Sequence, residues 1–272
     1  MKQLANCLSL VLLGSAAIAA GCSSSNPASS NGGSNGAGGG SGGGASGSKL
    51  TALVPDATGF VDVGGSIPTG ITGAWYAYGD GIGSDGTAMT GDCELKGGHA
   101  ATDCSAITSP PFGVFMNTGG KMCTQGTVAK ILNITGGTTP DYNNIWGAGI
   151  GLDLNNAGGD AGAVKKTYNA TGAGVIGMAF DIDVVPAANM RIEFPTNATN
   201  AAFWDGLKQI SPVVAGHNEV LWTKVTGPFY DATAPAFDPT SIFSIQFHVL
   251  TSATSAGTYN FCISNLSAIM AN

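Results

Sequence analysis

Charged side chains are scarce in this sequence of 272 residues, of which they make up only 10%. Basic residues are the scarcer kind, with 10 Lys and Arg against 17 Asp and Glu, and the formal net charge is −7. An acidic surface repels polyphosphate, so we expect no nucleic-acid partner. The chain also has no basic tract that could hold it on anionic lipid, so any membrane attachment has to be covalent.

Spacings typical of metal or catalytic sites are equally sparse. The three histidines, His99, His217 and His248, have no partner at ligand spacing, and no Cys-x-x-Cys pair occurs, so zinc is not expected. A Gly-x-Ser-x-Gly string at 39–43 falls in a linker, and no helix follows the Gly-x-Gly-x-x-Gly string at 81–86. We therefore expect no catalytic centre and no catalytic cofactor.

Glycine is abundant instead, with 43 residues, and together with Thr and Asn it favours strands and turns over helices. Only 201–210 has helical spacing. Eight runs separated by turn residues predict an all-β fold, a two-sheet antiparallel β-sandwich or jelly roll. The runs are 74–78, 122–134, 146–154, 175–184, 190–194, 221–225, 242–249 and 259–269.

Alternation within three of these runs assigns side chains to faces, because successive residues of a strand point to opposite sides. The residues expected in the core are Met178, Phe180, Ile182, Val184, Ile192, Phe194, Ile245, Phe247 and Val249. The polar residues expected on the opposite face are Asp181, Asp183, Arg191, Glu193, Gln246 and His248. If the three strands belong to one sheet, these polar groups share its outer surface.

The N-terminus has the pattern of a bacterial lipoprotein. Lys2 precedes an apolar segment at 8–20 that is too short to span a bilayer, and Ala19-Ala20-Gly21-Cys22 resembles a lipobox. We expect a signal peptide at 1–21, a lipidated Cys22 with a flexible tether at 22–48, and a single domain at 49–272. Ser23 fits sorting to the outer membrane or cell surface. An ordinary signal peptide with an incidental thiol at Cys22 is the alternative.

Four cysteines remain in the expected domain, an even number that indicates two disulfides in an exported chain. Three connectivities are open. We favour Cys93–Cys104, which closes a local loop, and Cys123–Cys262, which joins an early strand to the last one.

Two further features suggest ligands. Asp80 and Asp85 in a glycine-rich loop could offer oxygen ligands to a structural Ca²⁺, although a plain turn explains them equally well. Among the four tryptophans, Trp75 and Trp222 are expected in the core. Trp146, which precedes three alternating glycines at 147–151, and Trp204 could instead stack on sugar rings.

Taken together, several motifs resemble family 11 carbohydrate-binding modules, within the galactose-binding-like jelly rolls, over nearly all of 51–272. The motifs are Gly73-Ala74-Trp75-Tyr76 with Asp80, Trp146-Gly147-x-Gly149-x-Gly151-x-Asp153, Tyr168-Asn169-Ala170, 174–182, Trp222-x-x-Val225 and Phe261-x-Ile263-x-Asn265-Leu266.

This resemblance implies a jelly roll, often with a structural calcium ion, that binds polysaccharide on its concave sheet without cleaving it. The positions that it assigns to the ligand are Asp153, Asp181, Asp183, Arg191, Gln246 and His248, with Trp146 or Tyr142 at the rim. The glycines at 147–151 stand where aromatic platforms are expected.

The leading hypothesis is therefore a surface-displayed, monomeric lipoprotein that captures or adheres to polysaccharide. A structural or adhesive protein that binds protein partners is the first alternative. A glycan hydrolase that uses Asp181, Asp183 or Glu193 is the second, because glycoside cleavage needs two carboxylates on either side of the scissile bond.

Overall fold

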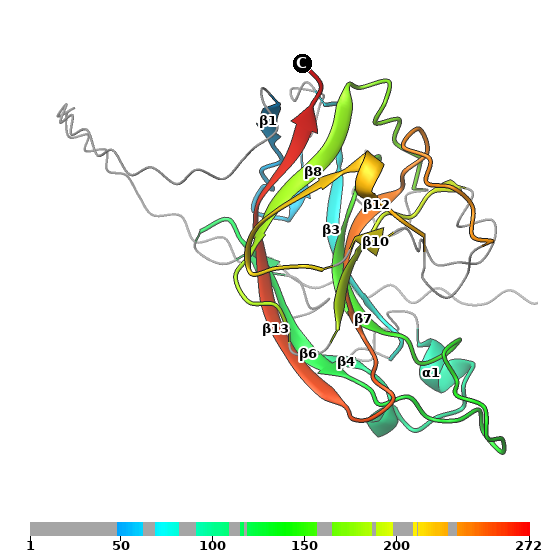
Figure 1. Cartoon of the computed structure of the whole chain (residues 1–272). Helices are drawn as coiled ribbons and strands as arrows, with labels where there is room; N and C mark the ends of the chain where they lie inside the picture. Colours follow the sequence, from blue (N-terminus) through cyan, green and yellow to red (C-terminus); the bar gives the residue numbers. More distant parts are fainter. Residues whose placement is uncertain are drawn as a thin grey trace, which may run out of the picture. The chain divides into compact units, whose positions relative to one another are not determined.

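The strands of the protein form two antiparallel sheets that pack face to face (Figure 1). This computed structural model describes residues 48–61, 69–81, 91–108, 115–116, 119–156, 165–186, 189–197, 209–210, 212–227 and 233–272. All of them belong to one unit, Ala45–Asn272. The predicted all-β, two-sheet antiparallel sandwich is confirmed.

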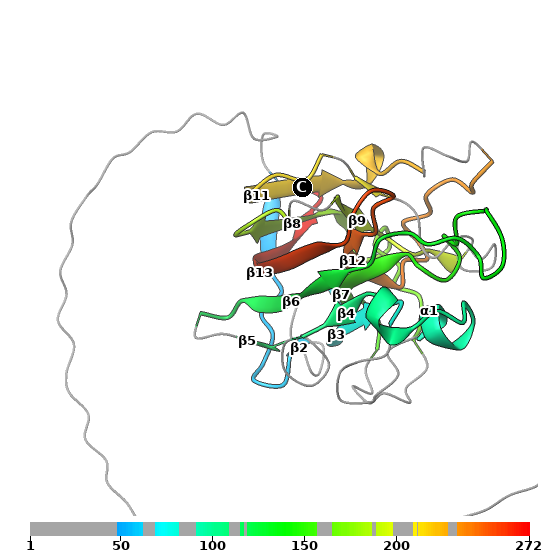
Figure 2. The same cartoon turned by 90° about the horizontal axis from the view of Figure 1, so that it is seen from below.

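The first sheet has seven strands in the order β11-β8-β13-β6-β4, with β1 paired to β13 and β5 to β6. Figure 2 shows β11, β8, β13 and β6 side by side in this order. The strands are β1 (Lys49–Ala52), β4 (Ala106–Ile107), β5 (Phe115–Met116), β6 (Met122–Val128), β8 (Val175–Ile182), β11 (Gly216–Leu221) and β13 (Gly257–Met270).

The second sheet has six strands in the order β10-β9-β12-β7-β3-β2. They are β2 (Phe60–Val61), β3 (Gly73–Gly79), β7 (Gly147–Asp153), β9 (Met190–Glu193), β10 (Gln209–Ile210) and β12 (Ser244–Leu250). The helical elements with described bounds are α1 (Asp92–Leu95), η1 (Ala101–Asp103) and η2 (Trp222–Lys224), and Asn197 is also helical. No described helix has the length and apolar character needed to cross a membrane.

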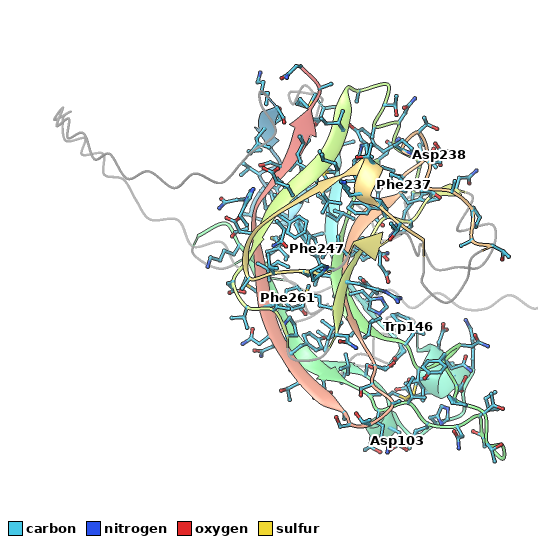
Figure 3. All side chains as sticks on the ribbon, in the orientation of Figure 1. Asp103, Trp146, Phe237, Asp238, Phe247 and Phe261 are labelled. Atoms are coloured by element: carbon cyan, nitrogen blue, oxygen red, sulfur yellow. A yellow bond between two sulfur atoms is a disulfide. The ribbon has the colours of Figure 1, made fainter. Side chains whose placement is uncertain are left out.

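Aromatic rings join the two sheets in the core. The ring of Phe180 on β8 meets that of Phe247 on β12 edge-on, with the centroids 5.0 Å apart. Trp75 stacks on Phe247 at 5.9 Å, and Trp222 donates a hydrogen bond from its indole to the carbonyl of Val175. Figure 3 shows Phe247 and Phe261 between the layers. The core positions predicted for Trp75 and Trp222 are confirmed.

Eight of the nine residues that alternation assigned to the core are buried, namely Met178, Phe180, Ile182, Ile192, Phe194, Ile245, Phe247 and Val249. Val184 is an error of the prediction, since it is 56% exposed. The strand ends at Ile182, and the Asp183 carboxylate then accepts the N–H groups of Val184 and Cys262. The alternation therefore stops two residues before Val184.

One other expected element differs from the structure, and the segment with helical spacing is described only at its end. The run at 221–225 was expected to be a strand, but β11 ends at Leu221 and η2 occupies Trp222–Lys224. Of the segment 201–210, which has helical spacing, only Gln209–Ile210 is described, and it forms strand β10. These two residues pair with β9, and the expectation for 201–208 lies outside the described residues.

The shared polar face expected for Asp181, Asp183, Arg191 and His248 is also wrong. β8, which carries Asp181, lies in the seven-stranded sheet, whereas β9 and β12, which carry Arg191 and His248, lie in the six-stranded sheet. Because each sheet turns its polar residues away from the core, the two aspartates lie on the opposite side of the sandwich. Alternation shows which side chains of one strand point to the same side, but it does not show to which sheet the strand belongs.

On that outer surface Asp181 joins three strands through polar contacts. Its carboxylate lies 2.9 Å from Nδ1 of His217 on β11 and accepts a hydrogen bond from Asn265 on β13 at 2.6 Å. Nε2 of His217 lies 3.3 Å from Glu219. The hydrogen bond to Asp181 raises the pKa of His217, and the hydrogen bond from Asn265 is the main cause that lowers the pKa of Asp181.

Both predicted disulfides are present. Cys93–Cys104 joins two cysteines that are 11 residues apart in the sequence. Cys123–Cys262 joins two cysteines that are 139 residues apart and lie directly opposite each other on β6 and β13.

We predict that His217 gives the protein a pH-dependent stability. A histidine whose folded pKa is raised stabilises the fold most below its unfolded pKa, about 6.5, and this stabilisation is lost as the pH rises through the folded pKa. Wild type should thus lose about 0.5 kcal/mol of unfolding free energy between about pH 5.5 and 8.5, a small value because the side chain is half exposed. Urea unfolding of wild type and His217→Gln tests this, and an unchanged pH dependence in the variant would contradict it.

The two disulfides should differ in their contribution to stability. In the chain-entropy model, the longer Cys123–Cys262 loop stabilises by about 5 kcal/mol and the Cys93–Cys104 loop by about 3 kcal/mol. Cys123→Ala with Cys262→Ala should therefore lower the free energy of unfolding more than Cys93→Ala with Cys104→Ala, as measured by chemical denaturation. The reverse order would show that native-state packing, rather than loop closure, dominates.

Candidate functional site

The outer side of the six-stranded sheet carries a group of aromatic and polar side chains, which we call the aromatic face. It is defined by Tyr76, Tyr78, Trp146, Asp153, Arg191, Glu193, Gln246 and His248. Figure 3 shows Trp146 on the side of β7 that faces away from Phe247 and the core.

Strand pairing brings these residues into two rows across the sheet. In the first row Tyr78 on β3 pairs with Gly149 on β7, which pairs with His248 on β12, which pairs with Arg191 on β9. Side chains in one such row point to the same face. Residues from four strands are thereby placed together.

The second row runs parallel to the first, from Tyr76 through Gly151 and Gln246 to Glu193. Within it the Gln246 side-chain amide donates a hydrogen bond to the Tyr76 hydroxyl at 2.9 Å.

The rings of the neighbouring strands occupy the space above the glycines of β7. A Cβ added at Gly151 would lie 2.7 Å from Oη of Tyr76, and one added at Gly149 would lie 2.9 Å from Oη of Tyr78. At Gly147 the nearest side-chain atom would be Nε2 of His248, at 3.0 Å. At Gly147 and Gly149 the closest atoms are backbone carbonyl oxygens of β12, at 2.1 and 2.2 Å, so the glycines leave room both for the close approach of β12 and for these side chains. The rings of Tyr76 and Tyr78 stand at the position where the sequence shows no aromatic residue on β7.

Trp146 completes a cluster of three rings. Its indole stacks on Tyr78 with the centroids 6.1 Å apart and an interplanar angle of 23°, and it meets His248 edge-on at 5.6 Å. Tyr78 and His248 also contact each other edge-on at 5.7 Å. Trp146 and Tyr78 are partly exposed, so this cluster presents aromatic surface on the face.

A buried ion pair lies beside the cluster. Oε1 of Glu193 accepts hydrogen bonds from Nε of Arg191 and from Nδ1 of His248, the latter at 2.9 Å. Only 2% of Glu193 and 4% of His248 are exposed. Burial raises the pKa of the Glu193 carboxyl, but His248 and Arg191 lower it by more than burial raises it. The net shift of the pKa is therefore downward, and the carboxyl group is ionised at neutral pH.

A second ion pair borders Tyr76. Nζ of Lys165 lies 2.9 Å from Oδ1 of Asp153 and 3.9 Å from the centroid of the Tyr76 ring, a cation–π geometry. Asn156 donates a hydrogen bond to the other oxygen of Asp153 at 3.0 Å. Both carboxylates of the aromatic face are therefore paired with a cation, Glu193 with Arg191 and Asp153 with Lys165.

Asp80 holds the backbone that carries Trp146. Its fully buried carboxylate accepts N–H groups of Trp146 and Gly147 at 2.7 and 2.6 Å, and the N–H and hydroxyl of Ser105 at 2.8 and 3.0 Å. The end of β3 is thereby joined to the start of β7.

The environment of the Asp80 carboxylate is unsuited to binding calcium. Its four hydrogen-bond partners are all N–H or O–H donors, whose hydrogens would point at the cation. Asp85, the second expected ligand, lies outside the described residues. Among those described, the one cluster of three groups with metal-binding chemistry is Cys93, Glu94 and Cys104, and its cysteines are joined in a disulfide.

A small apolar cluster fixes the chain just before Trp146. Ile145 is fully buried beside the Cys93–Cys104 disulfide. Nearby, Asp141 accepts hydrogen bonds from Asn144 and lies 2.9 Å from Nε2 of His99. Although burial raises the pKa of Asp141, these two hydrogen bonds lower it below its ordinary value.

The residues proposed from sequence separate into three groups. Asp153, Arg191, Gln246, His248 and Trp146 are brought together on the aromatic face, and Tyr142 lies 60% exposed in the turn that precedes Trp146. As described for the fold, Asp181 and Asp183 lie on the other sheet. Trp204 and Cys22 lie outside the described residues.

Sequence reasoning missed Tyr76 and Tyr78 as members of the face and assigned no binding role to Glu193 and Lys165. The two tyrosines had a usable signal, because Trp75 was expected in the core and alternation then turns Tyr76 and Tyr78 outward. Lys165 had none, since it lies in no strand.

Comparisons with known proteins return the family that the motifs resemble. No family model matches the chain, and no curated protein matches it. Among solved structures, the chain is similar to the family 11 carbohydrate-binding module of cellulosomal cellulase Lic26A-Cel5E of Clostridium thermocellum. The two are 17% identical, with a TM-score of 0.26, over 58% of this chain and 87% of that chain.

The chain is also similar to a family 11 module from Clostridium thermocellum in complex with a β-1,3-1,4-mixed-linked tetrasaccharide. This pair shows 16% identity and a TM-score of 0.27 over 61% of this chain and 95% of that chain. At these scores the description of the fold rests on the strand pairing of this chain itself.

Proposed function

We propose that the folded domain binds a polysaccharide on the aromatic face without cleaving it. The observation that carries the proposal is the stack of Trp146 on Tyr78, which packs against the buried ring of His248 and presents aromatic surface beside paired polar groups. Sugar rings have apolar C–H faces that stack on aromatic rings and hydroxyls that need hydrogen bonds. The aromatic face offers both kinds of contact.

The charges of the face favour binding over hydrolysis. A glycosidase needs one carboxylic acid that stays protonated until it reaches the leaving group. Glu193, however, is held ionised by Arg191 and His248, and Asp153 is paired with Lys165. Neither of these two carboxylates has the environment of a general acid.

We further propose that the domain is displayed by a lipid on Cys22 at the bacterial outer membrane or cell surface, and that it acts as a monomer. The lipobox-like sequence 19–22 supports the anchor. The two disulfides agree with export, since such bonds persist in oxidising compartments.

Trp146→Ala should weaken glycan binding at least about tenfold, because it removes a stacking contact worth about 1.5 kcal/mol. Isothermal titration against mixed-linked β-1,3-1,4-glucan, xylan, galactomannan, laminarin, alginate and peptidoglycan fragments measures this. Asp181→Asn, on the opposite sheet, is the matched control and should bind like wild type. If wild type binds no member of this panel, the proposal fails and a protein partner becomes the better explanation.

Cys22→Ser should remove lipid attachment and release the protein from the membrane fraction when the full chain is expressed in a Gram-negative host. Metabolic labelling with radioactive palmitate and fractionation of the cells measure the two effects. Cys7→Ser, a change within the expected signal peptide, is the control and should remain labelled. Equal labelling of the Cys22→Ser variant would refute the anchor.

A further inference from the structure

Two polar atoms in the first row of the aromatic face lack a hydrogen-bond partner within the part of the chain that the structure describes. They are Oη of Tyr78 and Nε2 of His248, and both are buried. A buried polar atom without a partner costs about 1–3 kcal/mol, so native proteins keep few of them. These two belong to the same row across the sheet, on either side of Gly149, and both lie beside Trp146.

The partner of His248 fixes which of its nitrogens carries a proton. Nδ1 lies 2.9 Å from Oε1 of Glu193, which also accepts Nε of Arg191. An ionised carboxylate can only accept hydrogen bonds, so Nδ1 of His248 carries a proton. Because Arg191 already balances the charge of Glu193, a second proton on Nε2 would add an uncompensated charge to this buried group.

With its proton on Nδ1, the imidazole presents a bare lone pair at Nε2. Tyr78 offers the complementary group, because burial raises the pKa of its phenol well above the ordinary value and the hydroxyl stays protonated. The row thus contains one acceptor and one donor next to an aromatic stack. A hydroxyl group can donate to the first and accept from the second, whereas an ether oxygen can only accept.

We infer that Glu193 is a positioning residue, which holds His248 in the Nδ1–H form so that Nε2 accepts a hydrogen bond from a hydroxyl of the bound glycan, next to the phenol of Tyr78. This inference rests on the proposed function. In this inference Glu193, His248 and Tyr78 recognise a free sugar hydroxyl, and Trp146 stacks on the sugar ring.

Nitrogen-15 NMR of the histidine rings tests the first half of the inference in the free protein. His248 should show a protonated Nδ1 and an unprotonated Nε2 at neutral pH, and the His248→Phe variant identifies its signals by their loss. A proton on Nε2 would overturn the inference.

The role of Glu193 is tested by replacing the ion pair with apolar residues, Arg191→Met with Glu193→Met, which preserves volume without leaving a lone buried charge. In this variant His248 should lose its preference for the Nδ1–H form. An unchanged tautomer would show that Glu193 does not position the ring. If this variant does not fold, Glu193→Gln provides the same readout, and a tautomer mixture in it supports the role.

The role of Nε2 is tested by His248→Phe, which keeps a ring against Trp146 and Tyr78 and leaves Glu193 paired with Arg191. Titration with the same six polysaccharides should show binding weakened about tenfold, the value of one hydrogen bond to a buried acceptor. His217→Phe, a histidine on the other sheet, is the control and should bind like wild type.

The outcomes separate this inference from the proposed function. If Trp146→Ala weakens binding while His248→Phe binds like wild type, the glycan site stands and the hydroxyl contact at His248 is overturned. If wild type binds none of the six polysaccharides, the proposed function and the hydroxyl contact fall together.

Discussion

The candidate site depends on one steric constraint, the absence of side chains at Gly147, Gly149 and Gly151 on the outer side of β7. The hydroxyls of the β3 tyrosines lie 2.7 and 2.9 Å from the positions that a Cβ would take at Gly151 and Gly149, and at Gly149 the carbonyl oxygen of Phe247 is closer still, at 2.2 Å. A side chain at either glycine would push a ring out of the face. The outer surface of a twisted sheet thus becomes a layer of rings that a sugar can stack on, and the polar groups of β9 and β12 border that layer.

The position of Trp146 follows from groups that take no part in the face. Asp80 accepts the N–H groups of Trp146 and Gly147, and Ile145 is buried beside the Cys93–Cys104 disulfide. Burial raises the pKa of the Asp80 carboxyl, and the four donors around it counteract part of that rise because they stabilise the ionised form. A loop that would otherwise move is thereby fixed against the sheet, which lowers the entropy that ligand binding would cost.

Much of the fold follows from local patterns, while the site depends on which strands become neighbours. Alternation placed Phe180 and Phe247 in the core and turned His248 outward, because the period of two is a property of each strand. It could not assign Asp181 to a sheet, since pairing is decided by contacts far apart in sequence. For the same reason the contact of Glu193 with His248, which is 55 residues away in the sequence, could not be predicted from the sequence.

Backbone NMR during titration with mixed-linked β-1,3-1,4-glucan, or with whichever of the six polysaccharides wild type binds, tests the central claim most directly. If the glycan lies on the aromatic face, the amide signals of Gly147, Gly149 and Gly151 should shift first and furthest, while those of Gly177 and His217 on the other sheet stay in place. Shifts confined to Gly177, Asp181 and His217 would place the ligand on the opposite side of the sandwich and contradict the account.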